Sequence, residues 1–271
     1  MNTKRTKLLF SLSLLTTFSL PIIAISCGQQ VENSNNVANN YFQVNSDKAN
    51  LFYNPQTKIL DLSSTKLQNI RAGSFSKQAL KNIFITNEEF RKQVYDNEEK
   101  TIIIKKVIFP ETLEIIEEGA FYSLGLEVVD FSKTTKLKSI KEKAFADNNI
   151  SELILPDSVS NLGVSAFANN KIENLTLSKN LKVLNSFVFY HNNLKNVDLS
   201  NVTKVNDFSL SENNISELLL PKTLTQFANN SLDPKEPTTN PKTVLDVNNI
   251  DLKTVLINDN KNNEHNYTIK Q

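Results

Sequence analysis

The sequence predicts a mainly β, right-handed solenoid of about eight coils, with a curved parallel sheet on one side. We expect short second strands or turns on the other side and few or no helices. Two observations lead to this prediction. The apolar pattern Leu-x-x-Leu-x-Leu returns about every 22 residues over most of the chain, and a shorter apolar set followed by Asn accompanies it. Units of this length each supply a strand and bury their apolar side only against the next unit.

Residues 1–26 are predicted to be a lipoprotein signal peptide, which is absent from the mature chain. A basic start is followed by an almost uninterrupted apolar stretch, Leu8 to Ile25. Small residues at Ala24 and Ser26 suit a signal peptidase, and Cys27 follows at the position that a bacterial lipoprotein acyltransferase modifies. This ending resembles the lipobox of bacterial lipoproteins, in the relaxed form seen in mollicutes.

Two interpretations of Cys27 are open. Lipidation would anchor the chain at the extracellular face of the cell membrane, since two or more acyl chains bind stably and one binds only marginally. The alternative is an ordinary signal peptide or a membrane helix with an incidental cysteine. Cys27 is the single cysteine of the chain, which excludes a disulfide within one chain, and lipidation explains its presence economically.

Residues 27–50 are predicted to form a flexible tether, because they are rich in Gln, Asn, Ser and Val and lack periodicity. Residues 51–271 then form one solenoid. Its open ends need caps, since a strand edge left unpaired invites aggregation. We expect an N-terminal cap over about 51–62 and a C-terminal loop and cap over about 233–271. In the C-terminal cap, Leu252, Val255 and Ile257 are predicted to form a closing strand.

Eight strands are predicted from the apolar pattern. The intervals between its copies are 21 to 24 residues, a period that is the signature of leucine-rich repeats. A charged stretch, residues 86–101, interrupts the series as a short helix or an exposed loop. The copies begin at Thr57, Leu80, Ile104, Leu126, Ile150, Ile172, Leu194 and Ile215.

The second half of each unit carries a family resemblance. Ile116-Glu-Glu-Gly-Ala-Phe121, together with Leu153-Ile-Leu-Pro156, resembles the BspA-like, or treponemal-type, class of leucine-rich repeats over about 57–232. The resemblance implies a surface protein that acts in adhesion or interaction. Asn stands where this class usually has Cys after Ala-Phe, which we expect to alter hydrogen bonding between coils and not the core.

Two outward columns of the predicted sheet form a candidate binding surface, because side chains alternate along a strand. Strands about 4.8 Å apart spread eight such side chains over roughly 34 Å, enough for a protein partner. The candidate protein-binding residues are Phe84, Lys106, Ile108, Asp130, Glu152, Ile154, Thr176, Asp198, Glu217 and Leu219.

The apolar members of these columns are the expected anchors for a host or bacterial surface macromolecule, a protein in our interpretation. Asp130 and Asp198 would set its charge preference. Ordinary strand propensity explains the same apolar residues without a partner. The alternative function is a structural or antigenic surface-coat lipoprotein without a specific ligand.

Catalytic, metal, cofactor and nucleic-acid functions find little support in the sequence. The histidines are His191, expected to be a solvated turn residue, and His265. With Cys27 assigned to the anchor, no thiol remains, and the sequence has no glycine-rich phosphate loop. Removing residues 1–26 takes away three bases and no acid, so 27 basic residues remain against 29 acidic ones. We therefore expect no enzyme, no metal, no cofactor and no nucleic-acid partner.

Overall fold

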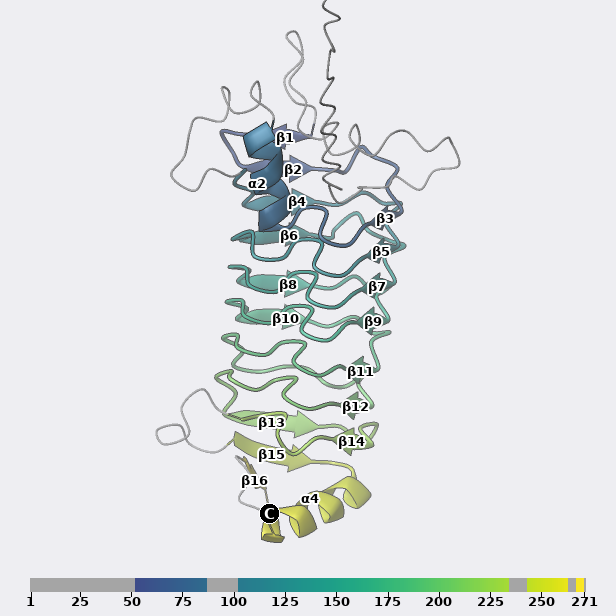
Figure 1. The fold of residues 1–271 in the computed structure, drawn as a ribbon. Helices are drawn as coiled ribbons and strands as arrows, with labels where there is room; N and C mark the ends of the chain where they lie inside the picture. The colour runs from purple at the N-terminus through teal and green to yellow at the C-terminus, as the bar shows by residue number, and fades with distance from the viewer. Residues whose placement is uncertain (1–51, 87–101, 234–242, 263–266, 271) are drawn as a thin grey trace, which may run out of the picture.

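The structure is a computed structural model that describes residues 52–86, 102–233, 243–262 and 267–270. Over these ranges the chain winds into stacked coils, with strands on two sides of the stack (Figure 1). This confirms the predicted solenoid with parallel sheets. It has about six turns, slightly fewer than the eight expected. Of the eight predicted strands, the one that begins at Leu80 is a helix and the one that begins at Leu194 does not form. The signal peptide, Cys27, the tether and residues 87–101 lie outside the described residues.

One side of the stack, which we call the wide side, carries strands from the Leu-x-x-Leu-x-Leu pattern. Its ladders form three sheets, β1-β2-β4-β6, β8-β10 and β13-β15-β16, and all pairings are parallel except that of β1 with β2. The strands are β1 (Tyr53–Asn54), β2 (Ile59–Asp61), β4 (Lys106–Ile108), β6 (Val128–Asp130), β8 (Glu152–Ile154), β10 (Asn174–Thr176), β13 (Glu217–Leu220), β15 (Thr243–Val247) and β16 (Tyr267–Ile269).

The predicted strand at 194–199 does not form. Leu194, Val197 and Leu199 are buried as the pattern requires. However, isolated backbone hydrogen bonds join this coil to its neighbours: the Asn193 N–H donates to the Ile172 carbonyl at 3.0 Å, and the Asn214 N–H donates to the Leu194 carbonyl at 2.9 Å. They hold the coil in the stack without building a ladder.

The other side of the stack, the narrow side, carries strands of two residues each. They form two parallel sheets, β3-β5-β7-β9 and β11-β12-β14, which confirms the predicted short second strands. These strands are β3 (Asn69–Ile70), β5 (Ile115–Ile116), β7 (Ser139–Ile140), β9 (Asn161–Leu162), β11 (Val183–Leu184), β12 (Lys204–Val205) and β14 (Gln226–Phe227).

A column of phenylalanine rings runs through the core. Successive rings stack with centroids 5.2 Å apart for Phe75 and Phe121, 5.1 Å for Phe121 and Phe145, 5.2 Å for Phe145 and Phe167, and 6.0 Å for Phe167 and Phe189. A small buried residue precedes each ring in the middle coils, so the column fills the core without overpacking it.

Buried asparagines connect the coils beside this column. Asn170 Nδ2 donates to the Phe145 carbonyl of the preceding coil at 2.9 Å and to the Phe167 carbonyl of its own coil at 3.1 Å. Its Oδ1 accepts the Ile150 N–H at 3.1 Å. One amide therefore satisfies buried backbone groups of two coils. Asn148, Asn192 and Asn213 make the equivalent bonds.

Two segments predicted as strands are helices, α2 (Lys77–Thr86) and α4 (Ile250–Asn262). Asn249 Oδ1 accepts the Leu252 N–H at 3.0 Å and caps α4, and Ser76 Oγ does the same for α2 through the Ala79 N–H at 3.3 Å. In α4, Leu252 and Leu256 are buried one turn apart, while Val255 is 54% exposed. The buried residues therefore follow the spacing of a helix and not the alternation of a strand. Among the described residues, no helix combines the length and apolarity needed to cross a bilayer.

The C-terminal end of the stack is closed by β15, β16 and α4 (Figure 1). Thr243, Leu245 and Val247 of β15 are buried in alternation, as in the repeat strands. The two closing strands, β15 and β16, therefore lie before and after the segment 252–257, in which a closing strand was expected.

We predict that Asn170→Ala destabilises the fold by about 2 to 4 kcal/mol, because it leaves buried backbone groups of two coils without partners. Urea unfolding followed by circular dichroism measures the change. Asn174→Ala, at an exposed position of β10, is the control and should change the free energy of unfolding by less than about 0.5 kcal/mol. Equal effects of the two substitutions would contradict the bridging role of Asn170.

Candidate interaction surface

Most of the predicted binding residues lie in two outward columns on the wide side. The ladders place Ile108 beside Asp130 and Ile154 beside Thr176. Ile154 is 59% exposed and Leu219 is 54% exposed, whereas Ile108 is partly buried. Lys106, Glu152 and Glu217 occupy the neighbouring column. Asp198 occupies the position equivalent to Ile108 and Ile154, in the coil that forms no strand.

The predicted strand position of Phe84 is wrong. Phe84 belongs to helix α2 and not to a strand, so it is not a member of either column. The sequence spacing of the Leu80 segment suits one face of a helix as well as a repeat strand, and the Ser76 cap decides in favour of the helix.

The aspartates of the outward column cap the turn that follows each strand, a role that the apolar pattern did not predict. Asp61, Asp130 and Asp198 each accept, through Oδ1, the N–H of the serine two residues later, at 2.9, 3.1 and 2.8 Å. Such side-chain caps are a common use of Asp in turns. The sequence signal for this role is Asp-x-Ser at the end of the strand pattern.

Asp130 is further engaged by a lysine. Its Oδ2 lies 3.2 Å from Lys106 Nζ, so two of the predicted binding residues pair with each other. Hydrogen bonding from Ser132 and, to a smaller extent, the charge of Lys106 hold the pKa of Asp130 below its ordinary value, against the opposing effect of burial. Asp130 is therefore charged and already partnered.

The apolar members of the column occur where the turn needs no cap. Ile108, Ile154 and Leu219 each stand two residues before a proline: Pro110, Pro156 and Pro221. Proline has no N–H, so the outward position is not required to supply an acceptor. The alternation of acidic and apolar side chains thus follows the alternation of Ser and Pro in the turn.

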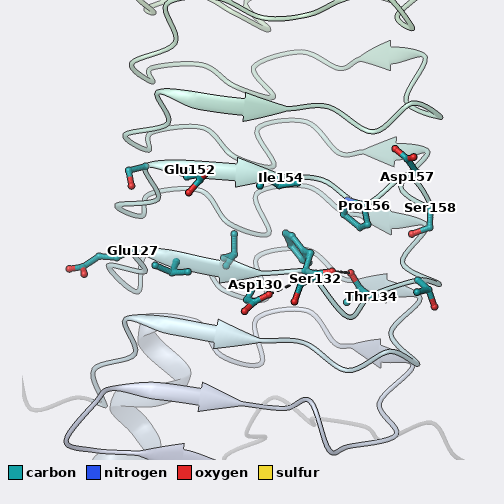
Figure 2. Close-up of a pocket in the computed structure, with 14 residues that line it drawn as sticks. Glu127, Asp130, Ser132, Thr134, Glu152, Ile154, Pro156, Asp157 and Ser158 are labelled. Atoms are coloured by element: carbon teal, nitrogen blue, oxygen red, sulfur yellow. Dashed lines mark hydrogen bonds between the residues drawn. The ribbon is translucent and has the colours of Figure 1, made fainter.

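A groove of about 580 Å³ lies between β6 and β8 (Figure 2). Glu127 and Glu152 stand at one end, and Thr134, Asp157 and Ser158 at the other. It contains three of the predicted binding residues, Asp130, Glu152 and Ile154. Its lining is Glu127, Val128, Val129, Asp130, Phe131, Ser132, Thr134, Thr135, Ser151, Glu152, Ile154, Pro156, Asp157 and Ser158.

An ionisable cluster surrounds His191 at a corner of the coils. His191 Nδ1 lies 2.8 Å from Glu212 Oε2, and the Tyr190 hydroxyl donates to the other oxygen of Glu212. This hydrogen bond, with some burial, raises the pKa of Tyr190 to about 12. His191 is a partly exposed turn residue with a φ of 53°. No group of three or more His, Cys, Asp or Glu side chains within the described ranges is arranged to hold a metal.

Comparison with known proteins gives a family match. The family described as BspA type Leucine rich repeat region (6 copies) matches residues 7–127 and 114–236. No curated protein matches the chain.

Three solved structures are similar to the chain, which spans between 54% and 66% of their lengths. A leucine rich cell surface protein from Faecalibacterium prausnitzii A2-165 shares 16% identity over 54% of each chain, with a TM-score of 0.38. The pneumococcal vaccine antigen PcpA shares 17% identity over 77% of this chain and 66% of its own, with a TM-score of 0.40. A leucine-rich repeat protein from Bacteroides ovatus ATCC 8483 shares 15% identity over 69% of this chain and 63% of its own, with a TM-score of 0.36.

We predict that Glu212→Gln lowers the pKa of Tyr190 from about 12 toward the ordinary value of 10.0, because the carboxylate that favours the neutral phenol is lost. The difference in phenolate absorbance between each protein and its Tyr190→Phe derivative measures this titration. The stabilisation from this bond is present below pH 10 and is lost as the pH rises through the folded-state value.

Tyr122 provides the control for this titration. A hydrogen bond to Asp147 raises the pKa of Tyr122. Glu212→Gln should leave the pKa of Tyr122 unchanged. Asp147→Asn should lower the pKa of Tyr122 and leave that of Tyr190 unchanged. A Tyr190 pKa that stays near 12 in Glu212→Gln would show that burial, and not Glu212, sets it.

Proposed function

The chain belongs to the BspA-type leucine-rich repeat family, and from this premise we propose that it is a bacterial surface lipoprotein whose wide side binds another protein. The observation that carries the proposal is the exposure of apolar side chains in the outward columns. Val128, Ile154 and Leu219 are 45%, 59% and 54% exposed. Side chains of this kind, held on a sheet, are the anchors around which protein interfaces form.

The turn chemistry of the wide side supports this assignment. Where the strand ends in Asp-x-Ser, the outward carboxylate is used by the turn. Where it ends in Pro, the outward side chain has no such task, and these positions are Ile108, Ile154 and Leu219. The apolar residues are thus the members of the column that are free to serve a partner.

The lipid anchor is the second part of the proposal. Cys27 follows Ala24 and Ser26 at the end of the apolar N-terminal stretch. Acyl chains on Cys27 would hold the repeats at the extracellular face of the cell membrane, with residues 28–50 as the tether. The partner would then be a host or bacterial surface protein.

The binding test uses the full-length chain, purified in detergent and immobilised. It is first screened for saturable binding against extracellular-matrix and cell-surface proteins. We predict that Ile108→Asp with Ile154→Asp lowers the affinity for any partner found by about 30-fold or more, the effect of losing anchors worth about 2 kcal/mol. Surface plasmon resonance measures the dissociation constants.

Val164→Asp is the control for this test, because Val164 is 40% exposed but follows β9 on the narrow side. It should leave the affinity unchanged. Unaltered binding by the Ile108 and Ile154 double variant, with its circular dichroism intact, would refute the wide-side site. Saturable binding of the immobilised chain to further copies of itself, and to no other protein, would favour a surface coat without a specific ligand.

We predict that Cys27→Ala moves the protein from the detergent phase to the aqueous phase of a Triton X-114 extraction, because it removes the acylated thiol. Metabolic labelling with an alkyne fatty acid gives a second readout, and the label should be lost in the variant. Ser34→Ala, in the predicted tether, is the control and should keep both the label and the detergent partitioning. Retention of Cys27→Ala in detergent would refute the lipid anchor.

A further inference from the structure

The wide-side sheet opens between β6 and β8, although the coils that carry these strands remain packed. β6 forms its ladder with β4, and β8 forms its ladder with β10. Before the strands, the two coils are joined by the Asn149 N–H, which donates to the Leu126 carbonyl at 2.7 Å. On the narrow side the ladder of β7 with β9 continues across the same two coils.

A glycine keeps the narrow side of these two coils close. A Cβ atom on Gly163 would lie 2.3 Å from the Glu142 backbone nitrogen, so no other residue fits without a backbone shift. The Gly163 N–H donates to the Ile140 carbonyl at 2.7 Å. The space between the two coils is therefore a wedge that is closed on the narrow side and open on the wide side.

The opening coincides with a longer coil. Subtracting the pattern starts gives 24 residues from Leu126 to Ile150, against 22 for each of the next two coils. The extra residues fall between Ser132 and Leu137, where Thr134 Oγ1 donates to the Phe131 carbonyl at 2.7 Å. Thr134 and Thr135 of this longer turn line one end of the groove.

The groove reaches between the strands as far as side chains of the core. Val129 is 8% exposed and Phe131 is 4% exposed, whereas their counterparts in the preceding coil, Val107 and Phe109, are fully buried. Val128 and Ile154 add exposed apolar surface at its mouth.

The groove is also acidic. Its lining contains four carboxylates and no basic side chain. Three of them pair with lysines from outside the lining: Glu127 with Lys105 at 2.8 Å, Asp130 with Lys106 at 3.2 Å and Asp157 with Lys179 at 3.0 Å. Glu152 makes no ion pair within the described part of the chain and stands at the mouth (Figure 2).

We propose that this groove binds an extended, basic segment of a partner protein, which adds as a strand along the open edges of β6 and β8. The proposal rests on the proposed function and names the chemistry of its partner. An open strand edge presents backbone N–H and C=O groups, which an extended peptide satisfies best. Alternate apolar side chains pack on Val128 and Ile154, and basic side chains face Glu152.

The dimensions and the polar end of the groove fit this occupant. Residues 127–132 span roughly 17 Å when extended, which suits a segment of about five residues. At the far end, Ser158 Oγ is buried and has no hydrogen-bond partner among the described residues, so it can bond a polar group of the segment. Glu152, the lining carboxylate without an ion pair in the described part of the chain, favours a basic side chain over a phosphate group, so a basic peptide is preferred to nucleic acid as the occupant.

The chain contains a control for the groove that lies outside the predicted binding surface. Glu118 is exposed, follows β5 on the narrow side, and makes no ion pair within the described part of the chain. Glu152→Lys and Glu118→Lys therefore make the same reversal of charge, once at the open edge and once away from it.

The test measures fluorescence anisotropy of a labelled Lys-Val-Lys-Val-Lys-Val peptide with the full-length chain in detergent. We expect saturable binding that Glu152→Lys weakens at least tenfold and Glu118→Lys changes less than twofold. A peptide of the same sequence with alternate backbone amides methylated should bind with at least tenfold lower affinity, because it cannot add to a strand edge. Circular dichroism melting checks that both variants fold.

Each contrary result has a distinct meaning. Equal binding of the methylated peptide, or equal effects of the two substitutions, would overturn strand addition in this groove. A full-length chain that self-associates in sedimentation, and becomes monomeric through Glu152→Lys, would assign the groove to a second copy and overturn the proposal. Partner binding that depends on Ile108, which lies outside the groove, and not on Glu152 would leave the proposed function standing and refute this inference.

Discussion

One buried amide in each of four successive coils holds that coil to the preceding one, and the rest of the structure depends on this bond. A coil of this kind cannot bury its apolar side alone, so its stability comes from its neighbours. The amide of Asn170 donates to a carbonyl of the preceding coil and to a carbonyl of its own coil, and it accepts the N–H of Ile150, where its own coil begins. This fixes the height and rotation of each coil, which in turn aligns the phenylalanine rings inside and the outward columns outside.

The sequence predicted the repeated parts of the fold better than its ends. The inward positions of the middle coils, such as Ile104, Val107 and Phe109, are buried as the pattern requires. The pattern failed at Leu80 and Leu252, where apolar residues three or four apart also fit a helix and a capping side chain precedes the segment. Periodicity alone cannot separate these alternatives over so few residues.

The candidate surface was predictable in position and not in detail. Alternation along the strands placed nine of the ten candidate residues on the wide side, and Phe84 failed with its strand. The cap that Asp130 provides to Ser132 requires the turn geometry, although Asp-x-Ser is visible in the sequence. The groove depends on a difference of two residues in one coil and on the backbone pairing that results, which side-chain patterns do not report.

The breaks in the two sides of the stack are staggered. The wide-side ladder is interrupted between β6 and β8, where the narrow-side ladder of β7 with β9 continues. The narrow-side ladder is interrupted between β9 and β11, where β8 and β10 remain paired. At each of these two breaks, the strands on the other side of the same two coils remain hydrogen-bonded. Nearest-neighbour coupling is thus kept along these coils, because a gap in the ladder of one side does not separate the coils on the other.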